Sequence, residues 1–188
     1  MSTSSSFTRL QELLPQLFQE PEFQGDAYLR IRLNTQLSAL ITMENIKESL
    51  SVSAEKITPI PGVPSFVMGL MSSRDSVFLV MDLAQLIGLA PLSTYNRQYD
   101  VMVLDLSNQV APSELTSENL LIGLAVTQIQ GIKRVVLQER EIREDLDNNL
   151  RTTDLTDNSK QYFYTKFESK GEELMILDLQ KIFPLIMK

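Results

Sequence analysis

A chain of 188 residues with a formal net charge of −7 is long enough for one sizeable domain and too acidic to favour a nucleic-acid surface, so protein partners are expected. It contains neither histidine nor cysteine, which removes the commonest general base, the commonest transition-metal ligand and the thiol nucleophile. We therefore expect no catalytic, metal or cofactor site. The sequence shows neither a secretory leader nor an apolar run near the ~20 residues of a membrane span, so we expect a cytoplasmic protein with no direct membrane insertion.

The first predicted element is an amphipathic helix within an N-terminal extension of residues 1–26. Leu10, Leu14 and Leu17 recur at helical spacing with polar residues on the other face, and Pro15 bends or restarts the helix. Such a helix can pack on its own domain or dock into the groove of a partner. Both interpretations stay open.

Apolar runs bounded by turn residues predict a succession of short strands. Two early hairpins are expected from residues 28–33 with 37–42 and 66–71 with 77–81. Later strands are expected over residues 99–106, 120–126, 162–167 and 173–177, and a short helix that bends or ends near Pro184 over 178–186. We expect these side chains to be buried: Val67, Phe78, Val80, Leu83, Leu86, Leu104 and Ile122.

Local signals define a short helix after the second hairpin. Asp82 is placed to cap a helix that continues through Leu86, and Gly88 can end it in the left-handed conformation. Residues 43–50 give a weaker pattern, which fits either a turn of helix or an irregular edge.

Short catalytic and metal motifs are incomplete. Ser53 to Lys56 match a Ser-x-x-Lys string, but its companions Ser-Asp-Asn and Lys-Thr-Gly are absent. Residues 145–149 begin like a calcium loop, but Leu150 occupies the position that requires glycine. These mismatches favour a binding protein over an enzyme.

The most specific pattern of the chain lies in residues 57–89: a proline-bounded strand, a glycine, a charged turn, an apolar strand and an Asp-Leu helix. This order resembles the CheW-like family, the adaptor proteins of bacterial chemosensory arrays. The family positions are occupied by Gly69, Arg74, Asp82, Leu83 and Gly88. The chain departs from the family at Asp75, where glycine is usual, and at Ser72 and Ser73, where the family has Asn-Leu.

The resemblance implies a mainly β fold of two intertwined five-stranded SH3-like β-barrel subdomains with short helices. It implies a CheW-like domain over residues 27–188. The first barrel would come from about residues 34–95, and the second from 27–33 and 96–188.

The resemblance also implies a non-catalytic adaptor that couples chemoreceptors to a histidine kinase, in the cytoplasm at membrane-associated receptor arrays. An apolar strand face would meet the kinase. The implied receptor-binding residues are Asn45, Ile46, Gly69, Arg74 and Asp75. The extended N-terminus and the divergent turn suggest a variant for pilus-linked twitching or phototaxis.

Two hypotheses from other classes remain. One is a carboxylate-dependent β-barrel enzyme, which turnover abolished by mutating a single carboxylate would favour. The other is a structural β-protein whose N-terminal helix, with Leu10, Leu14 and Leu17, mediates self-assembly. Solution mass after removal of residues 1–24 separates this second hypothesis from the adaptor.

Overall fold

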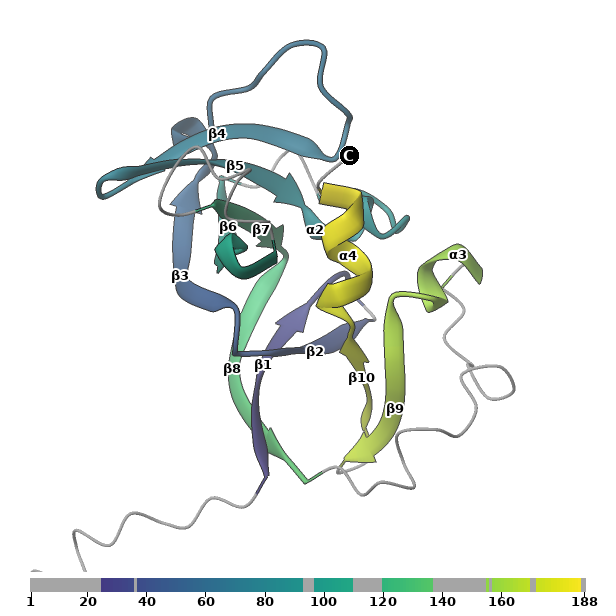
Figure 1. Cartoon of the computed structure of the whole chain (residues 1–188). Coiled ribbons are helices and arrows are strands. Elements are labelled where there is room, and N and C mark those ends of the chain that lie inside the picture. Colours follow the sequence, from purple (N-terminus) through teal and green to yellow (C-terminus); the bar gives the residue numbers. More distant parts are fainter. Residues whose placement is uncertain are drawn as a thin grey trace, which may run out of the picture.

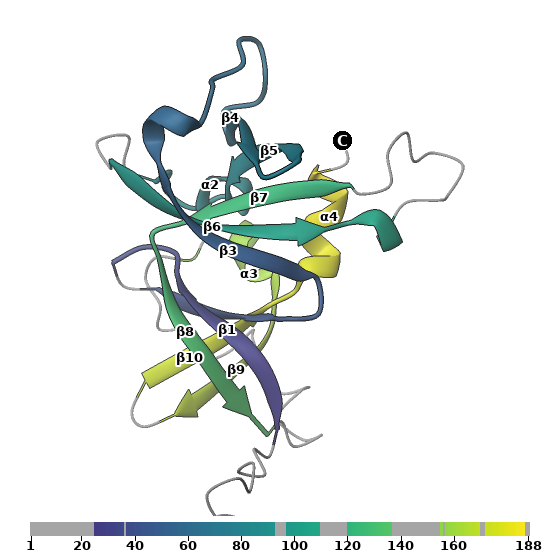
Figure 2. The same ribbon diagram turned by 90° about the vertical axis from the view of Figure 1, so that its left-hand side faces the viewer.

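The computed structural model describes residues 25–35, 37–92, 97–109, 120–136, 155, 157–169 and 172–186. These residues form ten strands and a few short helices, arranged as two five-stranded sheets stacked on each other (Figures 1 and 2). The mainly β fold with two barrel subdomains is thereby confirmed. We call them the lower and upper barrels, as they lie in Figure 1.

The lower barrel has the strand order β8-β1-β2-β10-β9. Its strands are β1 (Asp26–Arg32), β2 (Ser38–Thr42), β8 (Gln128–Val135), β9 (Phe163–Ser169) and β10 (Glu172–Leu177). The β1–β2 and β9–β10 pairs are antiparallel, as the sequence predicts, whereas β2 and β10 run parallel.

The upper barrel has the strand order β3-β6-β7-β5-β4. Its strands are β3 (Ile46–Ser53), β4 (Val67–Ser73), β5 (Ser76–Asp82), β6 (Gln98–Asp105) and β7 (Leu121–Val126). The predicted β4–β5 hairpin is confirmed, and β5 runs parallel to β7. Of residues 43–50, left open by the sequence, 43–45 form a turn and 46–50 belong to β3, at the edge of this sheet.

Short helices complete the described fold. Two 3-10 turns cover Ala54–Lys56 and Ser107–Gln109, and three α-helices cover Leu83–Leu86 (α2), Asp157–Lys160 (α3) and Leu179–Ile186 (α4). Helix α4 follows β10 of the lower barrel and lies beside the upper barrel (Figure 1). It continues through Pro184.

The division of strands between the barrels differs from the expected one. The five strands of the upper barrel, β3 to β7, follow one another in sequence, and the lower barrel combines the strands before and after them. Strand β2 therefore belongs with β1, and strands β6 and β7 belong with β3 and β5. Strand pairing is non-local, so apolar runs predict that a strand exists but not which strand lies next to it.

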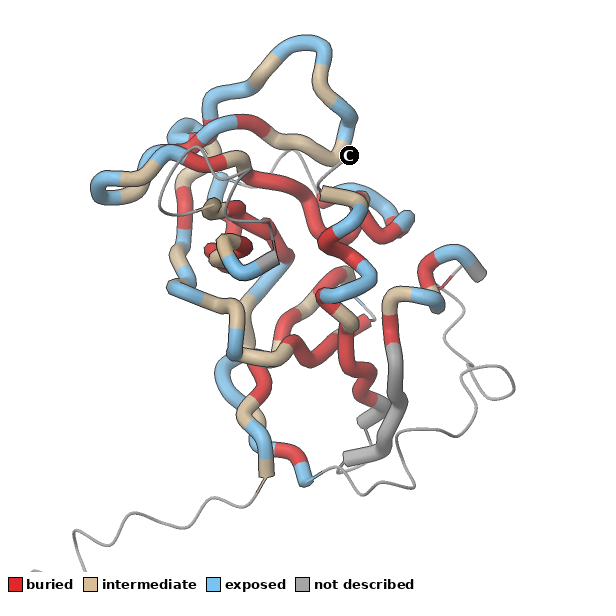
Figure 3. The backbone as a smooth tube through the Cα atoms, viewed as in Figure 1, coloured by how far each residue is buried: buried red, intermediate tan, exposed pale blue. Residues whose placement is uncertain are grey.

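Among the described residues, three apolar clusters form the core. One lies within the upper barrel around Phe78 and Val101, and a small one in the lower barrel joins Tyr28, Leu40 and Val135. The largest draws side chains from both barrels and from α2 and α4, so burial is continuous between the two (Figure 3). Six of the seven side chains expected to be buried are buried; Val67, at the start of edge strand β4, is partly exposed.

Asp82 holds the end of β5 to the loop after α2. Its carboxylate accepts hydrogen bonds from the backbone N–H groups of Gln85 (3.1 Å) and Leu92 (2.7 Å), which confirms the predicted cap. The side chain is 4% exposed, and burial raises the pKa of Asp82 despite these hydrogen bonds. Gly88, with φ +81°, follows the helix in the left-handed conformation as expected.

Gly69 permits a close backbone contact at the edge of the upper barrel. The N–H of Thr58 donates to the carbonyl of Leu70 and the N–H of Leu70 donates to the carbonyl of Thr58, both at 2.8 Å. A Cβ on Gly69 would overlap the carbonyl of Thr58. Glycine is therefore required by the approaching strand segment as well as by its φ of +150°.

We expect Gly69→Ala to lower the free energy of unfolding by about 1–3 kcal/mol more than Gly131→Ala does, because only the first adds an overlap. Gly131 also has a positive φ, +104°, but nothing lies within 4 Å of its added Cβ. Urea unfolding of the two variants measures the difference. Equal losses would mean that the Thr58 segment yields freely and does not constrain β4.

Candidate partner-binding site

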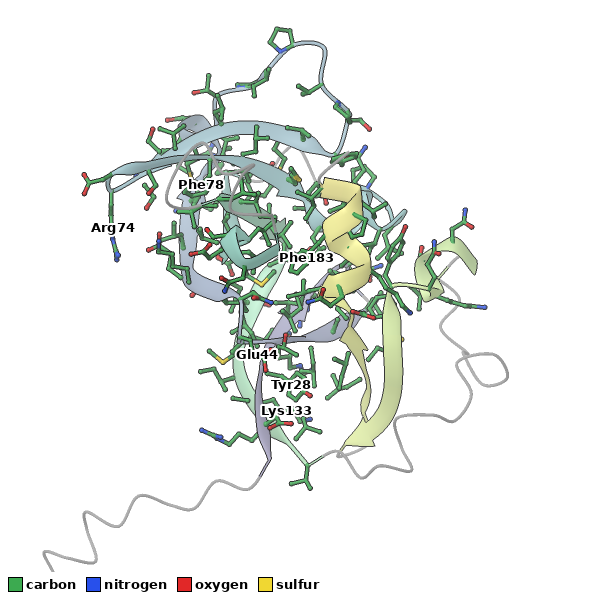
Figure 4. All side chains as sticks on the ribbon, in the orientation of Figure 1. Tyr28, Glu44, Arg74, Phe78, Lys133 and Phe183 are labelled. Carbon is green, nitrogen blue, oxygen red and sulfur yellow. The ribbon has the colours of Figure 1, made fainter. Side chains whose placement is uncertain are left out.

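The tip of the β4–β5 hairpin carries an arginine in a strained conformation. Ser73 and Ser76 form the last pair of the hairpin, so Arg74 and Asp75 make a two-residue turn. Arg74, with φ +52°, is the one non-glycine residue of positive φ in the described ranges. These φ signs match a type II′ turn, whose first central position ordinarily holds glycine. The Arg74 side chain is 82% exposed and projects beyond the barrel (Figure 4).

Glu48 on β3 contacts this arginine through an ion pair. Its Oε2 lies 3.4 Å from Nη2 of Arg74, and its Oε1 accepts a hydrogen bond from Oγ of Ser73 at 3.5 Å. The Glu48 side chain is only 19% exposed. Strands β3 and β4 are the opposite edges of the upper sheet, so these side-chain contacts connect the two edges at this end of the barrel.

The start of β3 is fixed by backbone hydrogen bonds. The carbonyl of Asn45 accepts from the N–H of Asp105 (3.0 Å), and the N–H of Ile46 donates to the carbonyl of Met43 (3.1 Å). Ile46 is half-buried and packs against the cluster between the barrels. A β-bulge between Ile46 and Glu48 then bends the strand.

Asp105 anchors the same end from the neighbouring strand. Its Oδ1 accepts hydrogen bonds from the hydroxyl (2.6 Å) and the N–H (3.0 Å) of Ser107. The hydroxyl hydrogen bond is the main reason why the pKa of Asp105 is lowered, and the positive charge of Lys47 adds to it. The carboxylate therefore stays ionised and keeps the β6 end, and with it Asn45, in place.

The residues that the resemblance singled out fall into three groups. Arg74 and Asp75 are exposed at the hairpin tip, and Asn45 and Ile46 lie just before Glu48, which contacts Arg74. Gly69 is buried against the Thr58 backbone and offers no side chain. The N-terminal candidates, Leu10, Leu14 and Leu17, lie outside the described residues.

Glu48 and Ser73 were missed by the sequence analysis. Glu48 lies between Ile46 and Leu50 at alternate positions of β3, on its half-buried face. A carboxylate at a position where the alternation predicts an apolar residue is the sequence signal that could have identified it. This signal was hidden because residues 43–50 fitted two structures, and only a strand gives Glu48 an inward direction. Its partner Arg74 is 26 positions away in the sequence, beyond any local pattern.

The outer face of the same hairpin is apolar. Val77 is 67% exposed and Leu70 38% exposed, and Leu79 pairs with Leu70 on that side. We call Leu70, Val77 and Leu79 the hairpin face. Scattered exposed apolar residues are normal, but three on adjacent positions of one strand pair form a small patch of the kind that binds protein partners.

An open pocket of about 430 Å³ lies where β1 and β2 meet the following turn, lined by Asp26, Ala27, Tyr28, Thr42, Met43 and Glu44. Tyr28 and Glu44 are labelled in Figure 4. No group of three or more His, Cys, Asp or Glu side chains that could hold a metal occurs in the part of the chain that the structure describes. Within the same ranges, no helix is long and apolar enough to cross a membrane.

Comparisons with known proteins bear on the family and the fold of the chain. The sequence profile of the CheW-like domain matches residues 27–186. The fold is similar to that of the scaffolding protein TtCheW from Thermoanaerobacter tengcongensis, with a TM-score of 0.60 at 15% sequence identity, over 85% of this chain and 93% of that chain. No curated protein sequence matches the chain. Because the profile covers well over half of its residues, the chain belongs to the CheW-like domain family, a family of scaffold proteins in chemotaxis signal transduction.

Proposed function

We propose that this protein is a non-catalytic adaptor that couples chemoreceptors to a histidine kinase in a bacterial chemosensory pathway, for chemotaxis or for pilus-linked motility. Family membership supports the scaffold role. The single observation that carries the receptor site is Arg74, an exposed arginine kept at a strained turn position and oriented by a half-buried carboxylate.

Magnitudes favour a binding role for Arg74 over a stabilising one. A non-glycine residue in a sparsely populated backbone region costs about 1–3 kcal/mol. An exposed ion pair such as Arg74–Glu48 returns only about 0–1 kcal/mol. The turn would therefore be at least as stable with glycine. We infer that the arginine side chain serves to bind a partner and not to stabilise the fold.

The chemistry of arginine suits a receptor contact. Its guanidinium has five N–H donors in a rigid fork, and arginine is enriched among residues that dominate binding energy. Glu48 approaches one terminal nitrogen, and the high exposure of the side chain leaves other donors for carboxylates or carbonyls of a receptor's helical tip. In this proposal Asp75 flanks the contact in the turn, Asn45 and Ile46 precede Glu48 on β3, and Gly69 supports the site by fixing β4.

The kinase would use the other side of the hairpin. Ser73 and Glu48 define the inner side, whereas Val77 and Leu70 belong to the outer hairpin face. Apolar strand faces are suited to a partner with a similar barrel surface, because burial of about 100 Å² of apolar area contributes about 2.5 kcal/mol. The receptor would therefore meet the tip of the hairpin, and the kinase would meet its outer face.

The rival enzyme hypothesis finds little support in the placed side chains. Asp82 is the one buried carboxylate among the residues whose burial is described. Both of its oxygens accept backbone N–H groups, from Gln85 and Leu92, so its role is to cap α2. A carboxylate committed to two structural hydrogen bonds is a poor candidate for general acid or base chemistry.

A crossed binding experiment tests the proposal. We expect Arg74→Glu to weaken co-sedimentation with a receptor fragment at least about tenfold while kinase binding is kept, and Val77→Asp to do the reverse, since removing a dominant contact costs about 2 kcal/mol. Arg97→Glu is the control, because Arg97 is also exposed but lies just before β6. Loss of both partners in one variant, or an equal effect of Arg97→Glu, would contradict the assignment of faces.

Arg74→Gly should be more stable than Arg74→Ala by about 1 kcal/mol, because both lose the side chain but only glycine relieves the positive φ. Both variants should fail to bind the receptor fragment. Thermal and urea unfolding measure stability, and the same co-sedimentation measures binding. An alanine variant as stable as the glycine variant would show that the turn is unstrained and remove the argument from strain.

A further inference from the structure

The lower barrel has an exposed apolar strip that the proposed function does not use. Ile132 is 64% exposed and Val136 59% exposed, whereas Val135 between them is buried. Because side chains alternate along a strand, Ile132, Arg134 and Val136 share the outer side of β8 and of the residue after it. We call Ile132 and Val136 the β8 strip.

The chain enters the domain directly beside this strip. Asp26 pairs with Val135, and the carbonyl of Gly25 accepts a hydrogen bond from Nη1 of Arg134 at 3.3 Å. A Cβ on Gly25 would come within 2.8 Å of the backbone nitrogen of Val136. Figure 1 shows β1 beginning next to the end of β8 at the bottom of the molecule. Gly25, the first residue that the structure describes, therefore lies next to the strip.

The sequence of that segment suits the strip in length and pattern. As a helix that bends at Pro15, Leu10 to Leu17 would extend up to about 11 Å, close to the ~13 Å from Ile132 to Val136 along an extended strand. Residues 18–24 can span up to about 25 Å, which is enough for the leucines to turn back onto β8. This connector carries Glu20 and Glu22, opposite in charge to Arg134 of the outer side.

We propose that the N-terminal segment docks in cis on the β8 strip, with Leu10, Leu14 and Leu17 against Ile132 and Val136. Attachment at Gly25 favours the segment of the same chain over any free partner, because a short linker gives an effective concentration in the millimolar range. The docked segment covers the lower barrel and leaves the hairpin face and Arg74 open. The proposal does not depend on the identity of the partners.

The absence of cysteine from the chain allows a clean crosslinking test. In the full-length protein, Leu14→Cys is combined with Ile132→Cys, and in a matched control with Val77→Cys, because Val77 has similar exposure (67%) on the other barrel. A short thiol-specific crosslinker is added at low protein concentration. We expect an intramolecular product in the first pair at a yield at least about tenfold above the control, as millimolar local concentration requires.

Each other outcome overturns the proposal. Equal or absent crosslinking in the two pairs would mean that the segment has no preference for β8, and a dimeric product that grows with concentration would assign the strip to a second copy. Hydrogen exchange gives a second readout that needs no crosslinker. Amides of residues 10–18 should exchange at least about tenfold faster in Ile132→Asp than in wild type or Val77→Asp, and unchanged exchange would contradict docking.

Discussion

Side chains of both barrels pack into one apolar cluster, and the position of every candidate surface follows from that packing. Leu29 and Ile31 come from the lower barrel, and Leu104 and Ile122 from the upper one. A five-stranded barrel of this size has a small interior; the cluster inside the lower barrel joins only four of the residues described as buried. Burial between the barrels supplies the remaining apolar area, so each barrel is stabilised by the other. The hairpin tip and the β8 strip are thereby held on one body.

The contact between Glu48 and Arg74 connects the fold to the proposed function. Edge strands β3 and β4 are joined there by side chains. The same carboxylate that joins the two edges also orients the arginine that we assign to the receptor. The strained turn at Arg74 adds a cost to the fold that its ion pair does not offset. Stability and recognition thus place opposite demands on this residue.

Local chemistry made part of the structure predictable. The β4–β5 hairpin, the Asp82 cap and the left-handed Gly88 all follow from residues close in sequence, and the structure confirms them. The allocation of β2, β6 and β7 to barrels was wrong because strand pairing is non-local. Glu48 was missed for a related reason. Its role depends on which side of β3 it faces and on Arg74, which lies far away in sequence in the β4–β5 hairpin. The pattern of Leu10, Leu14 and Leu17 remains a prediction.

An adaptor must hold two partners at once, and simultaneous occupancy is the most direct test of this account. A receptor fragment is titrated onto the protein after saturation with the kinase, and its affinity is compared with that for the protein alone. Because the proposed surfaces are the tip and the outer face of one hairpin and share no residue, we predict a ternary complex with receptor affinity within about threefold of the binary value, a difference below about 0.7 kcal/mol. Displacement of the kinase by the receptor would contradict the account, because the two partners would then share one surface.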